Sequence, residues 1–381
     1  MQRWNIDYLK KLYAKYDNLS DTTLDPTLSL EYESTANSIL DIIDRYNEMV
    51  KKKISLSSGV EISIHRSIVS SDFKIISDYG YYCPYIRLLS EYNSLLEINP
   101  NTNLPIIDTS AQRIVTLSNG FYSQFKGIFY DTYKEMAKSF KDTIHMRRIT
   151  GSTITAGQTY SVYKTGISFF ELGYNKTLQD YVSAIHEFGH GISSKLNPNA
   201  MWDFGKYCFI EVDSLFFEML GTDYIGEKLG RTKDAFDINM HVLKDYIYSA
   251  MLISTKLDMY SEFDRADLNS RRFVKQFLSR EVGLNKLGVN DVMKTYIRDY
   301  MHYIVSYLTA IELYLIYKDN PELALDLLFK IITCTKDNNK EYLDYIKSLG
   351  LEPGKNFEKY IQLLLDKAKD VKDEKSLRYK N

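Results

Sequence analysis

The stretch "YVSAIHEFGHGISSKL", residues 181–196, decides the fold, because its apolar residues recur at the spacing of an amphipathic helix. Thr177 and Asp180 precede it and are spaced as a capping box, and Asn197-Pro198 follows it as a stop signal. The sequence therefore predicts a helix over 178–196. Its buried stripe is formed by Leu178, Tyr181, Val182, Ile185 and Ile192.

This helix carries two of the chain's six histidines, with a glutamate between them. His186 and His190 are four residues apart, so they project from one face about one turn apart. That separation lets both imidazoles reach one zinc ion, and Glu187 lies close enough to act on a water there. Two core histidines satisfied by hydrogen bonds are the alternative, but chance gives this pattern in well under about one in a hundred such chains.

A third zinc ligand is expected from the segment "CFIEVDSLFFEMLGTDY" (208–224), which predicts a second helix over 209–229. Glu211, Ser214 and Glu218 share one face of that helix at i, i+3 and i+7. The chain between His186 and Glu211 is long enough to leave the first helix, turn and return antiparallel. A solvated face is the alternative for these residues, but the segment is otherwise so apolar that they should face something polar.

One region departs from helical periodicity. The segment "TGSTITAGQTYSVYKTGISFFELGY" (150–174) concentrates threonine, glycine and β-branched or aromatic residues. It predicts two or three short strands with turns near Gly151, Gly157 and Gly166. The last strand runs directly into the histidine-bearing helix, so we expect a small sheet beside that helix.

The rest of the chain predicts a mainly α protein, because glycine (18) and proline (7) are scarce among its 381 residues. A long helical pattern spans about 108–140, for example. A net charge of −2 gives no electrostatic case for nucleic acid or an anionic membrane as a partner. The oligomeric state is not indicated.

We expect a cytoplasmic protein. Cys83, Cys208 and Cys334 are too few and too widely spaced for a disulfide framework or a metal pair. The N-terminus predicts an amphipathic helix rather than a signal peptide. The most apolar segment (301–317) is interrupted by His302 and Glu312 and is short for a membrane span.

The motif "HEFGH" followed by E-V-D-S-x-x-x-E resembles the active site of the thimet oligopeptidase and oligoendopeptidase F family of zinc peptidases. The upstream "SFFELGYNKTLQDYVSAIHEFGHG" also resembles that family's edge strand and the start of its zinc helix. The match is specific over about 150–225 and weaker over 290–335, and we see none over 1–140.

The resemblance implies a role for each motif residue. His186, His190 and Glu211 would bind one zinc ion per chain, and Glu187 would be the general base and acid. Ser214 and Glu218 fall where the family has groups that support the ligands. The edge strand that pairs with the substrate backbone would be Ile167, Ser168, Phe169, Phe170, Glu171, Leu172, Gly173 and Tyr174.

The resemblance also implies a helical zinc-metallopeptidase fold with a small sheet next to the HExxH helix and a cleft between two helical lobes. Residues 1–140 would be a shortened helical N-terminal lobe. Residues 141–381 would be the catalytic region, with the small sheet at 150–174, the HExxH helix at 178–196, the glutamate-ligand helix at 209–229 and further helices after them.

The segment "TYIRDYMHYIVSYLTA" (295–310) holds four tyrosines at helical spacing, namely Tyr296, Tyr300, Tyr303 and Tyr307. The family presents tyrosines from a comparable helix to stabilise the oxyanion. This chain departs from the pattern, since His302 lies among the tyrosines rather than ahead of them. We take Tyr300 and Tyr303 as the candidates, with a packing stripe as the alternative.

Three functions remain open. The favoured one is a zinc endopeptidase acting on peptides. A zinc carboxypeptidase or dipeptidase would need a fixed cation for the substrate carboxylate, for which the sequence offers Arg147, Arg148 and Lys164. A catalytically idle peptide-binding protein is disfavoured, because it would have no need of Glu187. The isolated histidines are expected to be surface or satisfied core residues: His65, His145 and His241.

Overall fold

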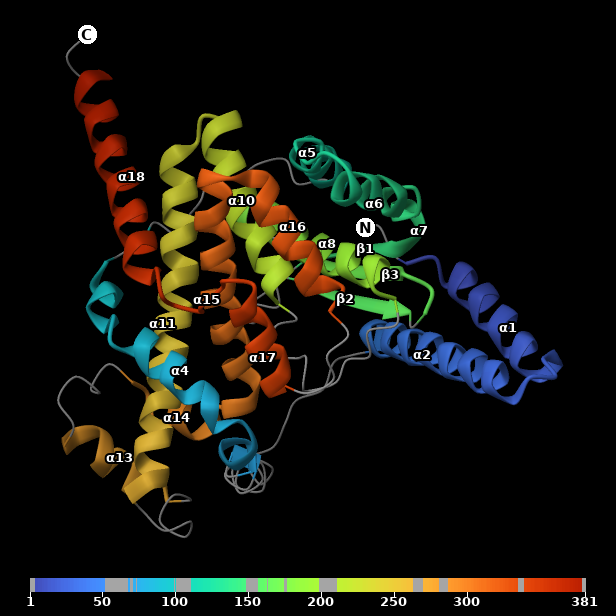
Figure 1. The fold of residues 1–381 in the computed structure, drawn as a ribbon, viewed down its shortest axis with the longest axis horizontal. Coiled ribbons are helices and arrows are strands. Elements are labelled where there is room, and N and C mark those ends of the chain that lie inside the picture. Colours follow the sequence, from blue (N-terminus) through green and yellow to red (C-terminus); the bar gives the residue numbers. More distant parts are fainter. Residues whose placement is uncertain are drawn as a thin grey trace.

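The computed structural model describes residues 4–51, 68, 71–72, 74–98, 100, 111–148, 157–162, 164–174, 177–198, 211–262, 270–280, 287–334 and 339–378. These residues form a mainly helical protein with one small sheet, which confirms the predicted fold class (Figure 1). Cys208 and His65 lie outside the described residues.

Some helices of the first half lie beside the sheet, and others pack on the helices of the second half. The bounds of the first-half helices are α1 (Ile6–Thr22), α2 (Pro26–Lys51), η1 (Gly80–Tyr82), α4 (Cys83–Ser90), η2 (Asn93–Glu97), α5 (Ala111–Tyr122), α6 (Ile128–Ala137) and α7 (Phe140–Thr143). The helical pattern predicted over about 108–140 is divided between helices, because the chain turns between α5 and α6. Gly127 caps α6 at a φ of 73°, a left-handed conformation that glycine adopts without strain.

The sheet consists of β1 (Ile144–Arg148), β2 (Gly157–Val162) and β3 (Ile167–Tyr174) in the order β1-β3-β2. β1 pairs parallel to β3, and β2 pairs antiparallel to it. The predicted sheet at 150–174 therefore began too late, since β1 precedes it. β1 is short and follows α7 directly, so its alternation of apolar and polar residues is too brief to be recognised in the sequence.

The prediction that Ile167–Tyr174 is an edge strand is wrong, because β3 is the middle strand. Its residue Phe170, for example, pairs with Ile144 on one side and with Thr159 on the other. The physical reason is backbone pairing, because β1 bonds to β3 on the side that faces away from β2. The side chains of Phe169 and Phe170 point to opposite faces of the sheet, and both are fully buried.

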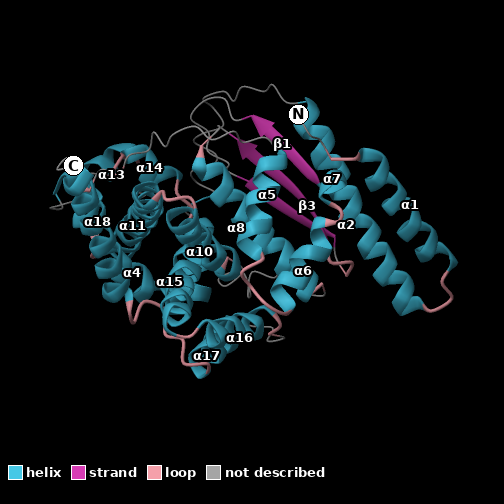
Figure 2. Cartoon of the chain, turned by 90° about the horizontal axis from the view of Figure 1, so that it is seen from above, coloured by secondary structure: helices cyan, strands magenta, loops and turns pink. Residues whose placement is uncertain are grey.

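Both faces of the sheet are covered by helices (Figure 2). On one face lies α8 (Leu178–Leu196), whose Phe188 packs on Phe170 with ring centroids 5.1 Å apart. On the other face lie α1 and α2, which share a small core with Phe169 and Val162. Trp4 anchors this layer, because its indole nitrogen donates a 2.9 Å hydrogen bond to the carbonyl oxygen of Phe170.

α8 has the predicted bounds and the predicted start. The backbone nitrogen of Thr177 donates to Asp180 Oδ2 at 3.1 Å, and the capping box is formed. Asn197 ends the helix. Gly189 then allows close packing on α10 (Val212–Lys228), since a Cβ at this position would lie 2.8 Å from the Cα of Ser214.

The second half is a helical bundle in which α10, the long α11 (Thr232–Glu262) and α15 (Ile297–Asp319) lie side by side (Figure 1). The remaining helices are α13 (Arg271–Arg280), α14 (Val289–Lys294), α16 (Pro321–Ile332), α17 (Asn339–Ser348) and α18 (Phe357–Arg378). No described helix is both long and apolar enough to cross a membrane.

One hydrophobic core runs from α5 and α6 into α8 and α10. Phe121 and Tyr133 of the first pair of helices contact Phe217 and Phe188 of the second pair. The division into a lobe over 1–140 and a catalytic region over 141–381 stays a prediction, and packing is continuous across that boundary.

Candidate metal centre

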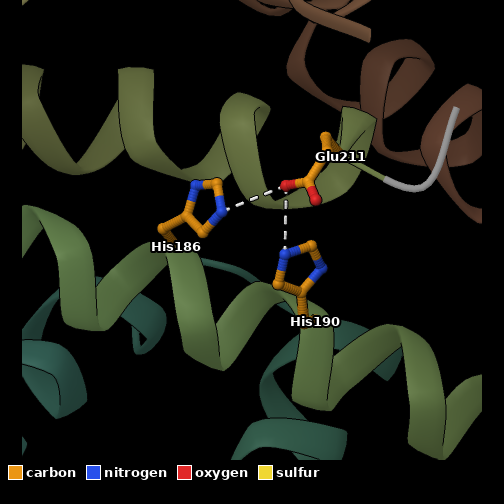
Figure 3. Close-up of side chains that lie close together, drawn as sticks. All are labelled: His186, His190 and Glu211. Atoms are coloured by element: carbon orange, nitrogen blue, oxygen red, sulfur yellow. Dashed lines mark ion pairs between the residues drawn. The ribbon is translucent and has the colours of Figure 1, made fainter. Parts of the chain in front are cut away.

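Three side chains converge between α8 and the start of α10 (Figure 3). His186 and His190 project from one face of α8, and Glu211 is the residue at which α10 begins. The Nε2 atoms of both histidines lie 3.1 Å from Oε2 of Glu211. Within the described ranges, no other group of three His, Cys, Asp or Glu side chains is placed to hold a metal ion.

The donor set fits zinc. Two imidazole nitrogens and one carboxylate oxygen are ligands that zinc takes in catalytic sites. Tetrahedral zinc with bonds of about 2.0–2.1 Å holds its ligand atoms roughly 3.3 Å apart. The observed 3.1 Å separations around Glu211 Oε2 therefore need little adjustment to receive the ion.

The polar face predicted on the second helix points at α8. Glu218 Oε2 lies 2.9 Å from Nδ1 of His186, which orients the ring so that its Nε2 faces Glu211. A carboxylate on the remote nitrogen of a ligating histidine fixes its tautomer and strengthens it as a ligand. Ser214 donates to the backbone oxygen of Glu211 at 3.0 Å and lies 3.2 Å from its Oε2.

The cluster is held together by opposite charges. Burial alone would lower the pKa of His186, but hydrogen bonds with Glu211 and Glu218 outweigh it and raise the pKa well above its ordinary value. Burial likewise favours the neutral form of Glu211, yet His190 and His186 hold its pKa well below the usual range. In the absence of metal, these contacts therefore favour the charged forms of His186 and Glu211 together.

Glu187 points to a different partner, the edge strand β2. The hydroxyl of Thr159 donates a 2.6 Å hydrogen bond to Glu187 Oε2. Gly157 is equally close, since a Cβ there would lie 2.5 Å from Glu187 Cγ. Sequence reasoning missed both contacts, because no spacing rule connects a residue of a strand to a helix that follows later in the chain. Burial raises the pKa of Glu187, and the two histidines oppose that rise.

Asp213 is a further buried carboxylate at the site. It accepts a hydrogen bond from the hydroxyl of Ser193, and burial raises its pKa while the nearby His190 opposes that rise. It stands in the segment "EVDS" between Glu211 and Ser214, so the sequence did contain a signal. The pattern alone had suggested no role for it.

The tyrosine face of α15 divides into two parts. Tyr300 and Tyr303 are 39% and 36% exposed and line a pocket of about 260 Å³ together with Glu218. Tyr307 is 1% exposed and stacks on Tyr246 with ring centroids 4.1 Å apart, so it is a packing residue. Tyr296 caps the helix.

Tyr246 of α11 was missed by sequence reasoning, and it lines the same pocket. Burial raises the pKa of its phenol well above the ordinary value, and the charges of Glu218 and Glu211 raise it further. Its hydroxyl therefore lies within the electric field of the cluster's carboxylates. Nothing in the local sequence of α11 distinguishes it from the many other tyrosines of the chain.

The other predicted residues lie apart from the cluster. His145 is buried beside Trp4, with ring centroids 6.2 Å apart, and His241 Nε2 lies 3.6 Å from Asp245 Oδ2. Lys164 forms an ion pair of 2.5 Å with Glu31 of α2. The side chains of the two arginines in β1, Arg147 and Arg148, lie outside the described part of the chain.

No protein-family model matches this sequence, and no curated protein matches it. Solved structures do share its fold. A chain assigned as oligoendopeptidase F superposes with a TM-score of 0.53 at 13% identity, over 96% of this chain and 66% of that one. A structure of PZ peptidase A with an inhibitor gives 0.50 at 11% identity, over 91% and 64%.

These comparisons confirm the resemblance at the level of the fold. The present chain spans about two thirds of the length of the structures that it matches. The superposition over 96% of this chain extends well into the range 1–140, where no likeness is visible in the sequence.

Proposed function

We propose that this chain, which has the fold of oligoendopeptidase F, is a zinc-dependent peptidase that hydrolyses internal bonds of peptides. The observation that carries the proposal is the convergence of His186, His190 and Glu211 on one point, with Glu187 beside them. An idle binding protein would have no use for a buried carboxylate at that position.

The three converging residues would hold one zinc ion per chain. When bound there, zinc would activate a water molecule and polarise the scissile carbonyl. Glu187 would take the proton of the attacking water and pass it to the leaving amine. Glu218 and Ser214 would keep His186 and Glu211 in their orientations.

The oxyanion that forms during attack needs a donor from the protein. Tyr300 and Tyr303 are the candidates, because both line a pocket together with Glu218, and Glu218 contacts His186. Tyr246 becomes a third candidate on the same ground.

We assign the substrate-pairing strand to β2 in place of β3. Among the described strands, β2 pairs only with β3, so its other edge has no strand partner there. Thr159 and Gly157 place this strand directly against Glu187. An extended peptide added to this edge would run past the general base.

The carboxypeptidase alternative receives no support from the described residues. It requires a cation that is available to the substrate carboxylate, and Lys164 is engaged with Glu31. We therefore favour cleavage of internal bonds.

Metal analysis combined with a peptide-library digest tests this proposal. Purified protein should hold about one zinc per chain, and the His190→Ala variant should lose it. Glu187→Gln should keep zinc and fold but lose peptidase activity by several orders of magnitude, since it removes the base and no ligand. Full zinc content in His190→Ala, or substantial turnover by Glu187→Gln, would overturn the assignments.

A further inference from the structure

The pocket beside the metal centre has a chemical character of its own. It lies between α10, α11 and α15 and measures about 260 Å³. This is somewhat below the roughly 300–1,000 Å³ of pockets that enclose whole small molecules. The space therefore suits a single side chain or a chain end rather than a whole peptide.

Its position ties the pocket to the proposed reaction. Glu218 forms part of the wall and at the same time contacts Nδ1 of His186 at 2.9 Å. A group inside the pocket would thus be one residue removed from a metal ligand. The pocket is therefore next to the proposed site of bond cleavage, where groups of the substrate on either side of that bond could enter it.

The wall carries two carboxylates, and the positive groups nearest to them, His186 beside Glu218 and His241 beside Asp245, are not among the residues that line the pocket. Two carboxylates, Glu218 and Asp245, face the pocket, and none of its lining residues is basic. Lys244, next to Asp245 in sequence, is turned away and donates to the carbonyl oxygen of Ile98 at 2.5 Å. Asp245 lies 3.6 Å from His241, and 71% of the aspartate side chain is exposed.

The remaining wall is aromatic. Tyr246, Tyr300 and Tyr303 contribute phenol rings, and Val242 and Ser249 complete the lining. The face of an aromatic ring attracts cations through its quadrupole. Rings and carboxylates together form a surface that attracts a cation and repels an anion.

We infer that this pocket is a specificity site for an organic cation of the substrate, and that Asp245 is the residue that selects it. The inference rests on the proposed peptidase function. The cation could be the side chain of an arginine or lysine near the scissile bond, or the α-ammonium group of a short peptide. Both sources present the same chemistry to the wall.

Matched peptides test the charge preference. One extended sequence is made with arginine, citrulline, lysine, norleucine or glutamate at each position that flanks the cleaved bond, with free and with acetylated N-termini. We expect kcat/KM to be at least about tenfold higher for the cationic peptide than for its neutral analogue at one position. If acetylation alone abolishes the preference, the cation is the α-ammonium group.

Variants assign that preference to the pocket. Asp245→Asn should reduce the ratio of cationic to neutral kcat/KM by about tenfold, and Asp245→Lys should favour the glutamate peptide. The matched control is Asp319→Asn, because Asp319 is 76% exposed and lies 3.6 Å from Lys359, away from the pocket. That variant should keep the wild-type ratio.

The outcomes separate this inference from the proposed function. Cleavage that depends on Glu187 but shows no charge preference, or a preference that Asp245→Lys leaves intact, overturns the specificity site alone. If no peptide is cleaved, the proposed function fails. In that case the specificity site is tested by binding alone, with the arginine and citrulline peptides carrying a fluorescent label. Wild type should bind the arginine peptide more tightly than the citrulline peptide, and Asp245→Asn should reduce that difference. Equal affinities of wild type for the two peptides overturn the inference.

Discussion

The hydroxyl of Thr159 in the edge strand β2 donates a 2.6 Å hydrogen bond to Oε2 of Glu187 on the helix beneath it. The Thr159 hydroxyl oxygen also lies 3.0 Å from the backbone carbonyl oxygen of Glu187. The strand that we assign to the substrate thus also holds the proposed general base. Substrate backbone and base would then be positioned by one element.

Replacing Thr159 by valine keeps the shape of the side chain and removes the hydroxyl. A hydrogen bond to a charged group contributes about 1.5–3 kcal/mol, so kcat should fall roughly 10- to 100-fold. Zinc content and KM should change little, because neither a ligand nor the edge of the strand is altered. Thr159→Ser should restore most of kcat; a Thr159→Val enzyme with wild-type kcat would contradict the positioning role.

Glu218→Gln tests how the cluster orients its ligand. The substitution keeps the shape of the side chain but weakens the charged contact with Nδ1 of His186. Loss of such a partner typically lowers metal affinity about 10- to 100-fold. Competition with a chelator of known affinity measures this. Glu227→Gln, at an exposed position of the same helix, is the control and should bind zinc as wild type does.

The free energy of unfolding of the metal-free protein should fall as the pH rises above 6.5, the pKa of an ordinary histidine. The pKa values of His186 and His190 are raised above 6.5, because Glu211 and its neighbours outweigh the effect of burial. The stabilising charge is therefore fully present below about pH 6.5 and is lost as the pH rises through the folded-state pKa values. Glu211 adds no slope there, since its lowered pKa keeps it ionised.

Zinc requires the neutral imidazoles, so its stabilising effect should grow over the same pH range. Thermal unfolding with chelator and with excess zinc, from about pH 6 to 9, measures both trends. The difference in Tm should widen with pH in the wild type and be nearly absent in a His186→Asn, His190→Asn double variant. A pH-independent difference in Tm would contradict the charged cluster.

The sequence was most informative where local signals are complete. The helix over 178–196 has its capping box, its buried stripe and its stop signal all between Thr177 and Pro198, so its bounds were predictable. The common face of Glu211, Ser214 and Glu218 follows from helical periodicity alone. The contacts of Glu211 and Glu218 with His186 could not be predicted in this way, because they depend on how α10 packs on α8.

Contacts between distant elements were not predictable in the same way. β3 lies in the middle of the sheet because the short strand β1 pairs with it on the side opposite β2. Thr159 meets Glu187 only because β2 pairs in one particular register with β3. Tyr246 belongs to the site because α11 lies beside α15, which no feature of its own helix reveals.

The phenols around the pocket offer the last test, since Phe replacement removes a hydroxyl and keeps the ring. If one tyrosine donates to the oxyanion, its Phe variant should lose about 10²–10³ in kcat with KM nearly unchanged. Tyr300, Tyr303 and Tyr246 are the three to replace, and Tyr307, buried in the core, is the comparison.

The same variants separate the two roles proposed for this wall. Because the rings remain, the preference for a cationic substrate should survive in the Tyr300→Phe and Tyr303→Phe enzymes even where kcat collapses. Loss of preference without loss of kcat would instead place the phenol hydroxyl in cation binding. If all three Phe variants keep wild-type kcat, the oxyanion donor is not among these tyrosines.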